Sequence, residues 1–131
     1  MPKVINYKLP RQQRIKKPDE FKLVYQSKQW GSSQHFSFNV LGLDSDSNAQ
    51  SRLGITVSKK VSKLAVLRNR IKRQIREYYR HHSESLILTD LVISAKPSCA
   101  KASDQERQIS LDQLWQKILK WQRWYLANQS G

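Results

Sequence analysis

The segment that decides the fold is residues 65–82, AVLRNRIKRQIREYYRHH. With about 100° of rotation per residue, its apolar side chains gather on one side of a helix. This apolar side consists of Leu67, Ile71, Ile75, Tyr78 and Tyr79. The opposite side consists of Asn69, Lys72, Arg73, Arg76 and Arg80, with Arg70 beside it. We therefore expect an amphipathic helix that packs on a sheet and directs its basic side outward.

One sign of charge dominates the outward side of this helix. Between Arg68 and Arg80 there are six Arg or Lys residues and one acid, Glu77. Exposed helix faces ordinarily mix the two signs and are stabilised by pairs four residues apart. Because this face repels itself, an anionic partner explains it better than solvation alone, and arginine pairs bidentately with phosphate.

The whole chain shares this imbalance. Its 131 residues contain 24 Lys and Arg against 10 Asp and Glu, a net charge of +14, and the length suits one domain. A polyanion is the expected partner, with a membrane surface as the alternative. The single cysteine, Cys99, excludes an internal disulfide, and we expect it to be a small buried residue. No apolar run reaches the roughly 18 residues that span a bilayer, and we expect a cytoplasmic protein.

The chain divides into a basic N-terminal arm over 1–13, a single domain over 14–127 and a tail over 128–131. The domain opens with a predicted helix at Pro18, since proline suits the first turn and the acids Asp19 and Glu20 suit the helix dipole. The apolar face of this helix consists of Phe21, Val24 and Tyr25.

Alternating polar and apolar residues predict two strands, over 34–43 and 53–57. The polar segment 44–51 separates them, so we expect a turn and a hairpin. A third, apolar strand is predicted at 91–95, and a short strand near Trp30.

The last helix is predicted to begin at Ser110, where Ser110 and Gln113 form a capping box. The element order is then α-β-β(-β)-α-β-α. This order predicts an α+β fold, a two-layer sandwich with one mainly antiparallel sheet packed with helices.

The aromatic residues admit two interpretations. Those of the first helix and first strand are interpreted as core, but a sheet with one free face also offers stacking platforms for bases. They are Phe21, Tyr25, Phe36 and Phe38. Those near the C-terminus are also interpreted as core, with an interface or a membrane-surface helix as alternatives. They are Trp121, Trp124 and Tyr125.

No residues form a catalytic or metal-binding pattern. His81 and His82 are adjacent in a helix and point about 100° apart, so they suit the helix dipole better than a shared metal ion. Segment 44–55 begins like a calcium-binding loop, but Ala49 replaces the required glycine and Ile55 the bidentate glutamate. We therefore predict no catalytic residue and no metal ligand.

Two strings of residues resemble a known family. They are Arg52-Leu-Gly-Ile-Thr-Val-Ser-Lys-Lys60 and Arg68-Asn-Arg-Ile-Lys-Arg-Gln-Ile-Arg-Glu77. This combination closely resembles the protein component of bacterial ribonuclease P. Segments 14–21 and 90–97 share the resemblance, which spans roughly Arg11 to Leu119.

The resemblance implies a subunit of an endonuclease that removes the 5′ leader from precursor tRNA. It implies that the catalytic RNA, with Mg²⁺, performs the cleavage, and that the protein alone binds no cofactor. The implied partners are this RNA and precursor tRNA, with no membrane and no protein partner. The domain of residues 14–127 is then an RNA-binding domain, and the family fold implies a left-handed β-α-β crossover, against the usual right-handed rule.

The resemblance also assigns residues to two RNA surfaces. The residues implied to contact the catalytic RNA are Arg68, Asn69, Arg70 and Arg73. Those implied to form a leader-binding cleft between the first helix and the sheet are Phe21, Tyr25, Phe38, Ser58, Lys59, Lys60, Lys72 and Arg76. Auxiliary basic contacts are Arg14, Lys16 and Arg80. The chain departs from the family at Asn39, which takes the place of a cleft aromatic unless Phe38 serves instead.

Two other functions remain open at this point. A structural RNA-binding protein of the ribosomal type shares the basic helix but needs no leader cleft. A membrane-active basic protein predicts helix formation over 117–126 on anionic vesicles.

Overall fold

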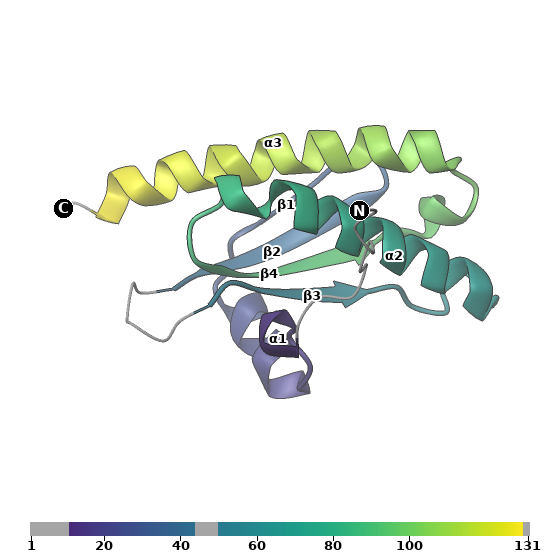
Figure 1. Ribbon diagram of the computed structural model, residues 1–131, viewed down its shortest axis with the longest axis horizontal. Helices are drawn as coiled ribbons and strands as arrows, with labels where there is room; N and C mark the ends of the chain where they lie inside the picture. Colours follow the sequence, from purple (N-terminus) through teal and green to yellow (C-terminus); the bar gives the residue numbers. More distant parts are fainter. Residues whose placement is uncertain (1–10, 44–49, 130–131) are drawn as a thin grey trace, which may run out of the picture.

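The computed structural model describes residues 11–43 and 50–129 (Figure 1). The predicted elements are present in the predicted order, and the short strand near Trp30 completes the sheet. The helices are α1 (Pro18–Gln26), α2 (Ala65–His82) and α3 (Asp104–Gln129). The strands are β1 (Trp30–Ser32), β2 (Phe36–Gly42), β3 (Arg52–Thr56) and β4 (Thr89–Ala95). Single 3-10 turns lie at Arg11–Gln13, Ser83–Ser85 and Pro97–Ala100.

The four strands form one sheet in the order β1-β2-β4-β3. β1 and β4 both pair antiparallel with β2, whereas β3 and β4 are parallel neighbours joined through α2. The sheet is therefore mainly antiparallel, as predicted, and contains the β-α-β unit that the resemblance implies. The predicted hairpin between 34–43 and 53–57 is wrong, because β4 lies between these strands. β4 is buried on both faces over its first five residues, which is typical of a central strand.

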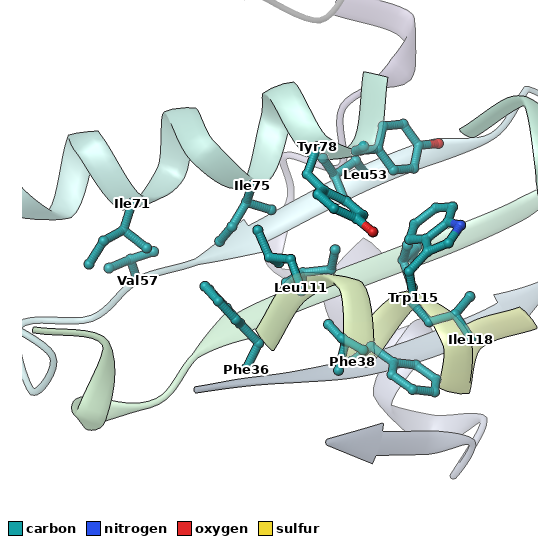
Figure 2. Packing of buried hydrophobic residues seen from close by; sticks show 14 of the residues in the cluster. Phe36, Phe38, Leu53, Val57, Ile71, Ile75, Tyr78, Leu111, Trp115 and Ile118 are labelled. Atoms are coloured by element: carbon teal, nitrogen blue, oxygen red, sulfur yellow. The ribbon is translucent and has the colours of Figure 1, made fainter. Parts of the chain in front are cut away.

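The main core lies between one face of the sheet and helices α2 and α3. Figure 2 shows Ile71 and Ile75 from α2, and Leu111 from α3, pointing toward Phe36 of β2. The buried residues of α2 are Ile71, Ile75, Tyr78 and Tyr79, while Leu67 packs at the edge of the core. The apolar side predicted for this helix is therefore confirmed.

Helix α1 packs on the opposite face of the sheet (Figure 1). Val24 is buried there with Ile15 and Val92, and Phe21 covers their edge. A Cβ atom on Gly54 of β3 would lie 2.7 Å from the Phe21 ring, so only glycine lets the ring lie against this strand. The second face of the sheet is thus covered in part, by α1 and by the segment before it that contains Ile15.

Helix α3 begins at Asp104, so the predicted start at Ser110 is wrong. The capping residues are Ser103 and Glu106: the Glu106 backbone N–H donates to the Ser103 hydroxyl, and the Ser103 N–H donates to the Glu106 carboxylate. Ser110 is buried inside the helix and accepts a hydrogen bond from the His35 backbone N–H at 2.9 Å.

The C-terminal end of α3 continues to Gln129, two residues into the predicted tail. Trp121 packs against the core, and Tyr125 stacks on it and lies against Gly42, as the core interpretation predicts. Trp124 is half exposed instead. The arm residues 1–10 and the turn residues 44–49, with which the segment resembling a calcium loop begins, lie outside the described residues.

Cys99 is fully buried, as predicted. Burial raises the pKa of its thiol to about 11, so the thiolate is not populated near neutral pH. Among residues 11–43 and 50–129, no helix is long and apolar enough to cross a bilayer.

Candidate nucleic-acid interface

The basic side of α2 faces away from the core, as predicted, but it divides into two flanks. Lys72 and Arg76 point toward the edge of the sheet at β3. Arg70 points toward the start of α3, where its Nη2 atom lies 2.8 Å from Asp104 Oδ2. Between the two flanks, Asn69 and Arg73 are exposed. The helix therefore offers positive charge in two directions at once.

A hollow of about 300 Å³ lies between α2 and the segment that precedes α1. Its basic lining consists of Arg14, Lys16, Lys72 and Arg76, and its apolar lining of Ile15, Leu53 and Ile55. The opposite wall is held against β3 by a hydrogen bond from Ile15 N to Leu53 O, 3.0 Å long. Sequence order alone does not place residues 14–16 beside 72–76, so this hollow is a product of the tertiary structure.

The electrostatics of Arg76 set this hollow apart. Burial, followed by repulsion from Arg14 and Arg73, lowers the pKa of Arg76. Its Nε atom is buried and has no hydrogen-bond partner among the described residues, and the same holds for Nη1 of Arg80. An anion such as a phosphate in this hollow would relieve the repulsion among Arg14, Arg73 and Arg76.

Arg68, the remaining residue implied to contact the catalytic RNA, lies at the N-terminal end of α2, close to three residues implied for the leader cleft. Arg68 donates from Nη1 to Ser62 O at 2.8 Å, which fixes its guanidinium beside the loop that enters the helix. Ser58, Lys59 and Lys60 form the exposed turn after β3, closed by a 3.0 Å hydrogen bond from Val61 N to Ser58 O. This turn adds two cations at the entrance to the helix.

Phe21 and Tyr25 of α1 are the aromatic residues that the resemblance assigns to the leader cleft. They lie beyond the edge strand β3, next to this hollow. Phe21 is half-buried against Gly54, and Tyr25 is 42 % exposed with its ring centroid 6.5 Å from that of Phe21. Ile15 connects the two regions, since it lines the hollow and also packs beside Val24. The residues assigned to one cleft therefore form two adjoining surfaces that meet at residues 14–16.

The assignment of Phe38 to the cleft is wrong. Its side chain is 3 % exposed and belongs to the main core, on the opposite face of the sheet from α1. The register explains this, because Phe38 pairs with Ile93, whose side chain also lies in that core. Asn39 occupies the face toward α1, where it pairs with Val92.

An ion-pair network holds α1 over the sheet, and sequence reasoning missed it. Arg52 of β3 donates to both carboxylate oxygens of Asp90 on β4, at 3.0 and 2.7 Å, and is also paired with Glu20 of α1. Hydrogen bonds from Lys17 N and then from Arg52 lower the pKa of Glu20 to about 2. The spacing of these three residues in the chain carried no signal; only the pairing of β3 with β4 brings them together.

Similarity to known proteins identifies the family. The family model for ribonuclease P matches residues 9–119. The chain belongs to the ribonuclease P protein family. The ribonuclease P protein component of Aliivibrio fischeri is 35% identical over 114 residues, covering 87% of this chain and 95% of the relative. That of Stutzerimonas stutzeri is 39% identical over 109 residues, covering 82% and 81%.

Solved structures of ribonuclease P proteins share the fold. The Staphylococcus aureus protein aligns with a TM-score of 0.72 at 31% identity, covering 79% of this chain and 93% of that one. The Thermotoga maritima protein aligns with a TM-score of 0.66 at 22% identity, covering 80% and 96%, which supports the fold alone. The match to the ribonuclease P model ends at Leu119, so the last ten residues of α3 lie beyond it.

The two histidines at the end of α2 make separate contacts. His82 stacks on Tyr78, with ring centroids 3.9 Å apart, whereas His81 lies 4.0 Å from the Glu77 carboxylate. Over residues 11–43 and 50–129, no group of three or more His, Cys, Asp or Glu side chains is arranged to hold a metal ion.

Proposed function

We propose that this chain is the RNA-binding protein subunit of ribonuclease P, and that it assists the catalytic RNA in removing the 5′ leader from precursor tRNA. Membership of the ribonuclease P family supports the assignment. The observation that carries it is the hollow lined by Arg14, Lys16, Lys72 and Arg76, in which burial and repulsion from neighbouring cations lower the pKa of Arg76. Such a group is stabilised by a phosphate, and a nucleic acid supplies phosphates in a row.

Each RNA has its own surface in this proposal. The residues that contact the catalytic RNA are Arg68, Asn69, Arg70 and Arg73, on the exposed side of α2 and beside α3. The residues that contact the leader are Phe21, Tyr25, Ser58, Lys59, Lys60, Lys72 and Arg76, with auxiliary contacts from Arg14, Lys16 and Arg80. Phosphate contacts position an RNA strand without reading its sequence, so little leader sequence preference is expected.

The chemistry belongs to the RNA in this proposal. The catalytic RNA, with Mg²⁺, cleaves the phosphodiester bond, and the protein contributes no catalytic side chain and no cofactor of its own. Its cations neutralise phosphates of both RNA molecules, which lowers the repulsion between substrate and catalyst. The protein should therefore increase cleavage most at low Mg²⁺, where fewer mobile cations neutralise the phosphates.

Reconstitution with the catalytic RNA tests the proposal. Purified protein added at low Mg²⁺ should restore cleavage of precursor tRNA at the 5′ end. A structural RNA-binding protein of another kind would bind RNA without restoring cleavage, and that result would contradict the proposal.

Charge variants test the assignment of the hollow. Arg76→Ala should weaken precursor binding and reduce the slope of log K against log salt by about 0.7, as expected for one lost contact to a single strand. Arg123→Ala is a matched control, since Arg123 is an exposed arginine near the far end of α3. Equal changes for the two variants would show that net charge, not the hollow, governs binding.

A further inference from the structure

Trp30 is the most exposed aromatic side chain of the sheet. It lies on β1, one of the two edge strands, and is 68 % exposed. Its position is fixed by the residues around it rather than by its own packing. Gln29 O accepts from Val40 N at 3.0 Å, and Gln29 Oε1 accepts from Trp121 Nε1 at 2.8 Å. The backbone that carries the indole is therefore anchored to both β2 and α3 before any ligand binds.

The strand register places Trp30 at one end of a row of residues. Trp30 pairs with Asn39, Asn39 with Val92, and Val92 with Gly54. Directly paired residues point to the same face of a sheet, and Val92 packs in the α1 cluster. Gly54, at the other end of the row, lies under Phe21. Three steps of about 4.8 Å between strands separate the backbone positions of Trp30 and Gly54, so these two ends of the row lie about 14 Å apart.

A second row of the same face runs beside the first and carries only small hydroxyl side chains. It consists of Ser32, Ser37, Ser94 and Thr56. Thr56 Oγ1 donates to Ser94 Oγ at 2.7 Å. Because these side chains are short, they rise little above the backbone of the sheet; we call this row the hydroxyl floor. Its hydroxyl groups can donate to phosphate or ribose oxygens and can accept from bases.

The observations together favour one occupant. A low hydroxyl floor with an exposed aromatic group at its end, on a chain of net charge +14, fits a single strand of nucleic acid with unstacked bases. An apolar protein surface would cover a row of polar hydroxyl groups on this floor, and a duplex would present no unstacked base to the indole. The floor also continues to Phe21, which the proposed function places beside the leader.

We infer that Trp30 is a stacking platform for a base of the unpaired 5′ leader, and that the hydroxyl row from Ser32 to Thr56 forms the floor under the strand. This inference rests on the proposed function and extends the leader path across the sheet, from Phe21 on α1 to the edge strand. The sequence carried no sign of it, because the register between β1 and β2 decides which face Trp30 occupies.

The test uses the full chain with the catalytic RNA. Trp30→Ala should weaken binding of a precursor tRNA with an eight-nucleotide leader by about 10-fold, the loss expected for one stacked base, while binding of mature tRNA is unchanged. Trp30→Phe should retain most of the affinity, and the salt slope should not change because no charge is removed. The matched control is Trp124→Ala, which removes the half-exposed indole of α3.

The outcomes separate the inference from the proposed function. If the wild-type protein binds precursor and mature tRNA equally, the proposed function fails. If the wild type prefers the precursor and Trp30→Ala keeps that preference, or if Trp124→Ala loses as much, only the inference fails.

A second measurement needs no substitution that removes a side chain. With 5-fluorotryptophan at all four tryptophans, the ¹⁹F resonance of Trp30 is identified by its absence from Trp30→Phe. A saturating unpaired oligoribonucleotide should shift this resonance and leave that of Trp115, which is 3 % exposed, in place. An unchanged Trp30 resonance at saturation would overturn the inference.

Discussion

The Glu20 carboxylate, in the first turn of α1, is paired with the Arg52 guanidinium at the start of β3. Arg52 is held in turn by Asp90 of the neighbouring strand, so one guanidinium joins a helix to two strands. This pairing fixes α1 over the face of the sheet where Phe21 and Trp30 stand. The surface that we assign to the leader therefore depends on an interaction outside it.

Glu20→Gln should destabilise the protein by about 1 kcal/mol near neutral pH, as the loss of a partly exposed ion pair predicts. The folded protein holds the pKa of Glu20 at about 2, below its ordinary value of 4.5. This contribution is therefore complete above about pH 4.5 and is lost as the pH falls toward 2. Urea unfolding at several pH values measures it, and the difference between variant and wild type should shrink in acid. Asp19→Asn is the control, and an equal loss at that neighbouring acid would contradict the role of Arg52.

Gly54→Ala should displace Phe21, because the added methyl group would lie 2.7 Å from the ring and 3.2 Å from Ile15 Cβ. We expect a loss of about 1–3 kcal/mol in the free energy of unfolding, typical of overpacking, and a weaker preference for precursor over mature tRNA. Phe21→Leu combined with Gly54→Ala should recover part of the stability. Additive losses in this double-mutant cycle would show that the two positions do not interact.

Asp104→Asn should strengthen binding of the catalytic RNA at low salt. Asp104 is paired with Arg70, so removing its charge leaves that arginine for a phosphate. The gain should be up to about five-fold, which corresponds to an exposed ion pair of up to about 1 kcal/mol. The salt slope should rise by about 1.

Asp112→Asn changes the net charge of α3 equally and is the matched control, because Asp112 accepts from Tyr78 and not from an arginine. Titration of both variants at several salt concentrations separates the two explanations. Similar gains for both would mean that Arg70 makes no specific contact with the RNA.

Ser110→Ala should cost about 1–3 kcal/mol, since it leaves the buried His35 N–H without an acceptor. The Ser110 hydroxyl also bonds Ser33 at 2.7 Å, so the same change loosens the turn between β1 and β2. Thermal unfolding measures the loss, with Ser103→Ala at the exposed cap as a milder comparison. A stability equal to that of the wild type would show that the site repacks or admits water.

Much of the site could be predicted from the sequence because it lies on one helix. The side of α2 that carries Lys72 and Arg76 follows from the helical period, and the period is a local property. The wrong assignments involve pairs of strands. Phe38 was placed in the cleft, and 34–43 was paired with 53–57, because the partner and register of a strand are set by residues far away in the chain.

The start of α3 at Asp104 illustrates a different error. The polar sequence Ser103-Asp-Gln-Glu106 contains a complete capping box, but the apolar period begins only at Leu111. The first turns of α3 lie beyond the hydrophobic core and therefore carry no apolar stripe. For this reason the helical period of apolar residues predicted a helix that is too short.

The sequence by itself determined the charge, the amphipathic helix and the family, since composition, helical period and short motifs are all properties of neighbouring residues. Only the tertiary structure decided that Arg14 faces Arg76 across a hollow, that Arg52 joins Glu20 to Asp90, and that Trp30 shares a face with Phe21. Each of these relationships depends on β4 entering the sheet between β2 and β3. A buried central strand selects its neighbours by packing on both faces, and no local pattern contains that information.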